Sequence, residues 1–144
     1  MTRSAMRFDV SEGVAQVTLA QPDRGNPIDA SFCSELCDIA TECDENPRIR
    51  AVLLRAEGPY FSVGADLKWL GAAREPLPRL LKASTAQLHM AMSRLSRADP
   101  PVVVAVHSLA VGGAVAFAAM ADFTLAGRSA RFYAAFTGIG FVCD

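Results

Sequence analysis

The chain has 144 residues, a length suited to one domain with a sizeable hydrophobic core. Hydrophobic residues make up 51% of it and charged residues 20%, which places it with globular proteins and excludes disordered and fibrous classes. Its formal net charge of −1 gives no general attraction to nucleic acid or to an anionic membrane, so neither is expected as a partner.

Targeting and metal signals are weak. The segment from Met1 to Phe8 has no apolar core long enough for a signal peptide, so a cytoplasmic location is expected. The apolar stretch from Val102 to Met120 is interrupted by polar residues and glycines, which favours a strand, a turn and a helix over a membrane span. No histidine stands at a zinc-ligand spacing from the cysteines of one predicted helix, so no metal site is expected and the thiols are interpreted as buried: Cys33, Cys37 and Cys43.

The first part of the chain predicts a hairpin, a helix and a buried strand. Apolar and polar residues alternate on both sides of Ser11 to Gly13, the pattern of two paired strands. Turn residues follow from Pro22 to Pro27, and Asp29 can cap a helix that runs to about Glu45. The short apolar run from Ala51 to Leu54 predicts a buried strand.

The second part predicts an amphipathic helix from Pro78 to Arg97, with three arginines toward water or a ligand: Arg79, Arg94 and Arg97. His89 lies off the apolar stripe of this helix and is expected to be solvated. The β-branched run from Val102 to Val106 is typical of a strand covered on both faces, and two more short strands are predicted, at Phe123 to Leu125 and Ala130 to Tyr133. Strand pairs interleaved with helices indicate an α/β fold in a single domain, residues 1–144.

Two glycine-containing segments carry the candidate chemistry. Phe61 to Lys68 predicts a turn with exposed backbone N–H groups, followed by a helix capped near Asp66. His107 to Ala114 leaves a buried strand and enters a helix whose first N–H groups lack internal acceptors. Two such donors could hold a thioester oxygen as it becomes an enolate oxygen, and losing one typically costs about 3–4 kcal/mol of barrier lowering. Taken singly, each segment is equally consistent with close packing alone, and neither has the glycine spacing of a nucleotide-binding loop.

In this order and separation, Phe61 to Lys68 and Pro101 to Asp122 resemble the two signatures of the enoyl-CoA hydratase/isomerase family, also called the crotonase superfamily. An early turn is also similar to the family's, at Pro22, Arg24, Asn26 and Ile28. The resemblance covers nearly the whole chain. It implies a crotonase-like spiral of ββα units that binds an acyl-CoA thioester.

The same resemblance assigns roles to the two segments. It places the oxyanion donors on the backbone of Ala65 and Gly113, with Gly112 in the same turn. It places bound coenzyme A along Ala65, Gly112 and Gly113 and along the residues after Ala65: Asp66, Leu67 and Lys68. Coenzyme A would enter as part of the substrate, so no separate cofactor is expected.

The chain departs from the hydratases of this family at their two glutamate positions, which here are Ala116 and Phe136. Neither side chain transfers a proton, so simple water addition is disfavoured. The segment from Thr137 to Asp144 is similar to family isomerases in which a final aspartate shuttles a proton. Asp144 is therefore the candidate base, and Cys143 beside it is interpreted as a bystander thiol.

The favoured function is an isomerase or lyase of acyl-CoA thioesters in fatty acid metabolism. Two alternatives stay open: an enoyl-CoA hydratase with atypical acid and base residues, and a non-catalytic acyl-CoA-binding or assembly protein. Family members continue into C-terminal helices that close the acyl pocket and form trimers, whereas this chain stops before them at Asp144. A homotrimer or hexamer is expected if that region is present, and exposed apolar surface with partner association or low solubility if it is not.

Overall fold

The main sheet is the frame of the fold. The computed structural model describes residues 4–136, 138 and 140. Within them, the strands of this sheet are ordered β1-β2-β3-β4-β6: β1 Met6–Ser11, β2 Val14–Leu19, β3 Ala51–Ala56, β4 Val102–Val106 and β6 Phe123–Ala126. The pair β1–β2 is antiparallel, and each later strand is parallel to its neighbour. Glu12 and Gly13 both have positive φ, which matches the twist of a two-residue hairpin turn, so the predicted hairpin is confirmed.

A second row of short extended segments lies beside the main sheet. Strand β5, Leu109–Val111, pairs in parallel with β7, Arg131–Tyr133. Isolated parallel bridges extend the row, from Ser62 to Ala110 and from Ala65 to Ile28. Each turn of the chain thus adds a strand to the main sheet and a short segment to the second row. The predicted crotonase-like α/β spiral is confirmed, although the sequence did not predict β5 as a strand.

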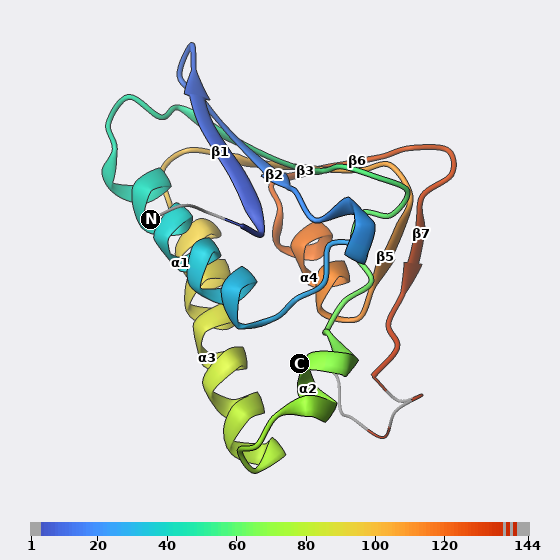
Figure 1. The fold of residues 1–144 in the computed structure, drawn as a ribbon. Coiled ribbons are helices and arrows are strands. Elements are labelled where there is room, and N and C mark those ends of the chain that lie inside the picture. Colours follow the sequence, from blue (N-terminus) through green and yellow to red (C-terminus); the bar gives the residue numbers. More distant parts are fainter. Residues whose placement is uncertain (1–3, 137, 139, 141–144) are drawn as a thin grey trace.

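The α-helices of the described chain fill the spaces of this spiral: α1 Ala30–Glu45, α2 Leu67–Ala72, α3 Leu77–Leu95 and α4 Gly113–Met120. A short 3-10 helix, η1 Pro22–Arg24, forms the early turn. Asp29 caps α1 as expected, because its Oδ1 accepts the Phe32 N–H at 3.0 Å. Figure 1 shows α1 and α3 side by side, with α4 on the same side of the main sheet.

The core lies between the main sheet and these helices. Alternate residues of the central strands are buried there, and Phe32 of α1 meets Phe117 of α4 at a ring-centroid distance of 5.9 Å. Arg94 binds Thr41 at 2.9 Å, Asp44 at 2.8 Å and Glu45 at 2.7 Å on α1. The arginine expected toward water or a ligand therefore joins α3 to α1.

Large apolar side chains are exposed on the last two strands. Phe123 and Leu125 of β6 are 65% and 62% exposed, and Phe132 and Tyr133 of β7 are also exposed. The exposed apolar surface predicted from the sequence is present at these strands, whereas association or low solubility stays a prediction. None of the helices in the described part of the chain is both long and apolar enough to cross a membrane.

Candidate active site

The backbone around Ala65 is fixed by a parallel bridge to Ile28. The Ile28 N–H donates to the Gly64 carbonyl at 2.8 Å, and the Asp66 N–H donates to the Ile28 carbonyl at 3.0 Å. Because successive backbone groups of an extended segment point to opposite sides, the Ala65 N–H is directed away from Ile28. Within residues 4–136 it donates to no other residue, so it is available to a ligand.

Gly113 opens helix α4, where first-turn amides have no acceptor inside the helix. The neighbouring amides donate to backbone carbonyls: the Gly112 N–H to that of Tyr133 at 2.8 Å, and the Val115 N–H to that of Gly112 at 3.0 Å. Gly112 has φ 55° and ψ −125°, a conformation that residues with a Cβ rarely adopt. Among the described residues, no acceptor takes the Gly113 N–H.

The two segments touch through their backbones. A Cβ on Gly64, whose φ is +79°, would lie 2.6 Å from the Val111 carbonyl oxygen and 3.7 Å from the Gly112 nitrogen. A Cβ on Gly113 would lie 3.4 Å from the Ile28 side chain, so Ile28 bridges both segments. The structure therefore brings the segments of Ala65 and Gly113 together, whereas the role predicted for their amides stays a prediction.

Both residues line a cleft of about 800 Å³, within the usual range for small-molecule sites. Its wall is mostly apolar and comes from α2, α3, α4 and the segment after β7. Ala116 and Phe136 are both part of this wall. The positions at which the resemblance puts glutamates therefore face the cleft, and neither supplies a carboxylate.

Two ionisable side chains line the cleft among the described residues, Cys33 and His89. Burial, with smaller contributions from Cys37 and Asp29, raises the pKa of the Cys33 thiol to about 12. This agrees with its interpretation as a buried, neutral thiol. None of Cys33, Cys37 and Cys43 forms a disulfide; Cys43 is buried as predicted, whereas Cys37 is only partly buried. No group of three or more metal-ligating side chains occurs among the residues that the structure describes.

His89 is exposed, as the sequence predicted, and it also borders the cleft. Helix α3 packs on α1 and also borders the cleft. Its buried residues are Leu88, Ala91 and Leu95, and Leu88 lines the cleft as well. Leu88 and Met92, which belong to the apolar stripe predicted for this helix, line the cleft together with Thr85.

The residues after Ala65 have structural roles of their own. Asp66 caps α2 by accepting the Lys68 and Trp69 N–H groups, each at 3.0 Å, and it also binds Arg24, which reaches Asp29 as well. The Trp69 N–H bond and the Arg24 guanidinium lower the pKa of Asp66 in spite of partial burial. Burial alone would lower the pKa of Arg24, but its two carboxylate partners raise it overall.

The structure does not place the other predicted residues in the cleft. Leu67 and Lys68 are exposed at the start of α2, and neither they nor Asp66 line the cleft, whereas the next residues, Trp69 and Leu70, do. Asp144 and Cys143 lie outside the described residues, so the candidate base has no described position.

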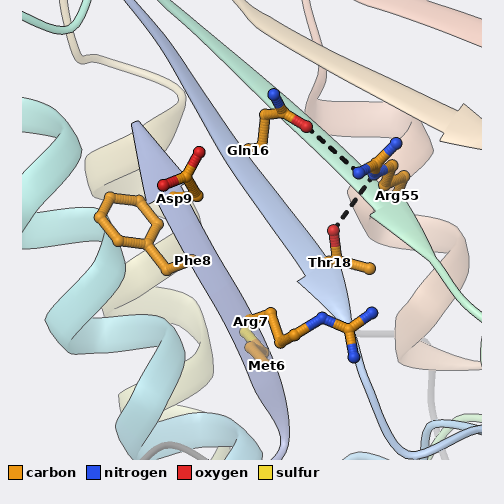
Figure 2. Close-up of a pocket in the computed structure, with 7 residues that line it drawn as sticks. All are labelled: Met6, Arg7, Phe8, Asp9, Gln16, Thr18 and Arg55. Atoms are coloured by element: carbon orange, nitrogen blue, oxygen red, sulfur yellow. Dashed lines mark hydrogen bonds between the residues drawn. The ribbon is translucent and has the colours of Figure 1, made fainter. Parts of the chain in front are cut away.

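A second hollow, of about 520 Å³, lies on the face of the β1–β2–β3 sheet (Figure 2). Its polar side chains bind one another: Arg55 donates to Thr18 and to Gln16, both at 3.1 Å, as the dashed lines in Figure 2 show. Arg7 on its rim pairs with Glu57. The described residues around this hollow all belong to strands and include no helix N-terminus, so the cleft with Ala65 and Gly113 is the better candidate for acyl chemistry.

Comparison with known proteins decides the family. The model of the family described as Enoyl-CoA hydratase/isomerase matches residues 9–144. The chain belongs to this family. Within the enoyl-CoA hydratase/isomerase family, it is 33% identical over 135 residues to a "probable enoyl-CoA hydratase" of Mycobacterium tuberculosis strain H37Rv, covering 92% of this chain and 51% of that protein. It is also 30% identical to the trans-2-decenoyl-[acyl-carrier-protein] isomerase of Streptococcus mutans, covering 95% of this chain and 52% of that protein.

Solved structures of family members agree with the fold. The crystal structure of an enoyl-CoA hydratase from Mycobacterium smegmatis superposes with a TM-score of 0.90 at 29% identity, covering 98% of this chain and 55% of that one. The chain spans about half the length of the curated relatives described above. Those relatives include a hydratase and an isomerase, so membership alone leaves both reactions open.

Proposed function

We propose that the chain binds an acyl-CoA thioester in the cleft and polarises its carbonyl on the backbone amides of Ala65 and Gly113. The observation that carries the proposal is the contact of Gly64 with Val111 and Gly112. It holds the amides of Ala65 and Gly113, which donate to no described residue, on one wall of the cleft. The N-terminus of α4 adds a positive electrostatic potential at the same place. Fixed donors of this kind stabilise the negative charge that develops on the carbonyl oxygen.

The enolate formed in this way supports several reactions. Hydration needs groups that activate water and protonate the α-carbon, but Ala116 and Phe136 can do neither. A double-bond shift needs less: a proton leaves one carbon of the acyl chain and another is added two carbons away. The proposed reaction is therefore isomerisation of an enoyl-CoA, with Asp144 carrying a proton to or from the acyl chain.

The coenzyme A moiety fits the rim of the cleft next to Ala65. Leu67 is 57% exposed, and Lys68 is exposed beside it, so both are accessible to a bound ligand. We place coenzyme A along Asp66, Leu67 and Lys68, with the Asp66 carboxylate engaged by Arg24 and by α2 instead of by the ligand. The acyl group then extends between α3 and α4 along the apolar wall.

A second candidate is a non-catalytic acyl-CoA-binding protein. It is favoured by the absence of a carboxylate at both Ala116 and Phe136 on the cleft wall. The two amides would serve this function equally well, so binding alone does not separate the candidates. The discriminating group is Asp144.

The test compares the parent chain with Asp144→Asn. Affinity for a β,γ-enoyl-CoA is measured by calorimetry, and its conversion to the α,β isomer by the absorbance of the conjugated thioester. The expected result is conversion by the parent and a loss of about 100-fold or more in the variant, at unchanged affinity, because positioned acid–base groups contribute about 10²–10⁴-fold. Binding without conversion by either protein would identify the binding protein instead.

A further inference from the structure

Arg24 links the caps of two helices beside the candidate oxyanion site. Its Nη2 donates to Oδ2 of Asp29 at 3.0 Å and to Oδ2 of Asp66 at 2.5 Å. With its Oδ1, Asp29 accepts the Phe32 N–H and caps α1, and Asp66 caps α2 in the same way. The side chains of the two aspartates are mostly buried, at 11% and 13% exposed, whereas Arg24 is half exposed. One guanidinium nitrogen therefore joins the starts of α1 and α2.

The two caps directly follow the parallel bridge that fixes Ala65. Asp29 is the residue after Ile28, and Asp66 is the residue after Ala65. The Asp66 N–H donates to the Ile28 carbonyl, so the bridge and the ion pairs hold the same two segments together. Since peptide units are planar, only the two backbone dihedral angles of Ala65 separate the peptide unit of its own N–H from the one that ends at Asp66. A displacement of Asp66 would therefore move the Ala65 N–H.

The turn that carries Arg24 is anchored to the same loop. The Arg24 Nη1 donates to Oε1 of Gln21 at 2.6 Å, which fixes the direction of the guanidinium. The Val63 N–H donates to the Gly25 carbonyl at 2.9 Å, so this turn is tied to the segment just before Ala65. The guanidinium is therefore held from both sides, by its own turn and by the two aspartates.

Without the guanidinium, two carboxylates would face each other. Because Asp29 and Asp66 bind the same nitrogen, their Oδ2 atoms lie close together, and like charges at short range repel. Solvent ions screen this repulsion less than at an open surface, since both side chains are mostly buried. Each carboxylate stays attached to its own helix start. The repulsion would therefore push the segments of Ile28 and Ala65 apart.

We propose that Arg24 is a positioning residue: by neutralising the two cap carboxylates, it holds the Ala65 amide in line with the thioester oxygen. This inference rests on the proposed function and deepens it by naming what fixes one of its two donors. An amide stabilises the developing charge only if it already points at the oxygen, so a displaced Ala65 N–H would lose its effect. Arg24 does not line the cleft itself and acts through Asp66.

The two donors should respond differently to the loss of Arg24. Gly113 opens α4 and is tied to the site through the contact of Gly64 with Val111, in which Arg24 has no part. In Arg24→Gln, Ala65 should lose most of the downfield amide shift that thioester binding produces, whereas Gly113 should keep its own. Affinity for coenzyme A, which lacks the carbonyl, should equal that of the parent.

Two further variants control for charge and for general loosening. Arg24→Lys should keep the Ala65 response, since one nitrogen contacts both carboxylates and an ammonium group can take its place. Arg94→Gln removes another arginine that binds two carboxylates, but these lie at the opposite end of α1 from Asp29. It should leave both amide responses at the parental size.

The experiment titrates the ¹⁵N-labelled parent, Arg24→Gln, Arg24→Lys and Arg94→Gln with a non-reactive acyl-CoA thioester and with coenzyme A. Loss of the Ala65 response in Arg24→Gln alone, with the Gly113 response retained, supports the proposal. A parental Ala65 response in Arg24→Gln overturns it, as does a parallel loss at Gly113 or an equal loss in Arg94→Gln. Loss of coenzyme A affinity in Arg24→Gln also overturns it and makes Arg24 a binding residue.

The lysine variant keeps the test decisive if Arg24→Gln does not fold. A folded Arg24→Lys with the parental Ala65 response supports the proposal, and one without that response overturns it. A parent that binds the thioester without a shift at Ala65 or Gly113 overturns the proposed function, and the role of Arg24 with it. That result differs from a responsive parent with an equally responsive Arg24→Gln variant, which removes the role of Arg24 alone.

Discussion

Replacing Gly64 by alanine tests whether close backbone contact sets the geometry of the site. The substitution imposes two costs. The φ of +79° is strained for a residue with a Cβ, at about 1–3 kcal/mol. The new Cβ would also lie 2.6 Å from the Val111 carbonyl oxygen, and forcing extra volume into a packed contact costs about 1–3 kcal/mol. Gly64→Ala should therefore lower the free energy of unfolding by about 2–6 kcal/mol.

Two other glycines separate these costs. Gly112 has φ +55°, but a Cβ added there would have no neighbouring atom within 4 Å. Gly112→Ala should therefore lower the free energy of unfolding only by the cost of backbone strain, about 1–3 kcal/mol. Gly71 has neither positive φ nor a neighbour within 4 Å, and it lies in α2, so Gly71→Ala should be neutral or stabilising by about 0.5–1 kcal/mol. Urea unfolding measures all three. If Gly64→Ala unfolds like Gly71→Ala, the contact does not constrain the two segments.

Three further predictions concern charge, reactivity and packing. Because its folded-state pKa is lowered, Asp66 stabilises the chain above the unfolded pKa of about 3.9 and loses that contribution as pH falls through the lower folded value. The difference in unfolding free energy between the parent and Asp66→Asn should therefore be constant from pH 7 to about 5 and shrink below pH ~4. Cys33 should resist alkylation at neutral pH until urea unfolds the chain, as followed by peptide mass, and equal labelling of the native chain would contradict its raised pKa. Phe117→Ala should cost about 3–5 kcal/mol in urea unfolding, since Phe117 is fully buried, whereas Phe123→Ala, at a side chain 65% exposed, should change stability by about 0.5 kcal/mol or less.

The elements that could be predicted from the sequence have their causes within a few residues. The hairpin follows from alternation and from Gly13, and α1 follows from its Asp29 cap and its apolar face. The strand from Val102 to Val106 follows from its β-branched run. Strand β5 was not predicted, because three small or apolar residues form a strand here only through pairing with β7 and with Ser62.

The site shows the same division between local and long-range causes. The glycines mark both turns, and the resemblance to the family indicates which amides to examine. The close contact between Gly64 and the Val111 carbonyl joins residues far apart in the sequence, so only the fold reveals it. His89 is exposed, as expected from its place off the apolar stripe of α3, but its position at the border of the cleft follows from how α3 packs in the fold. The ion pairs of the partly exposed Arg94 could not be predicted, since its partners lie on another helix.

The central claim is that two backbone amides hold the thioester oxygen, and amide NMR tests it most directly. The ¹⁵N-labelled chain is titrated with a non-reactive acyl-CoA thioester and, as the matched control, with coenzyme A, which has no thioester carbonyl. We expect the amide protons of Ala65 and Gly113 to shift downfield with the thioester and not with coenzyme A, because only the thioester offers the acceptor. Binding of the thioester without a downfield shift at either amide would contradict the claim.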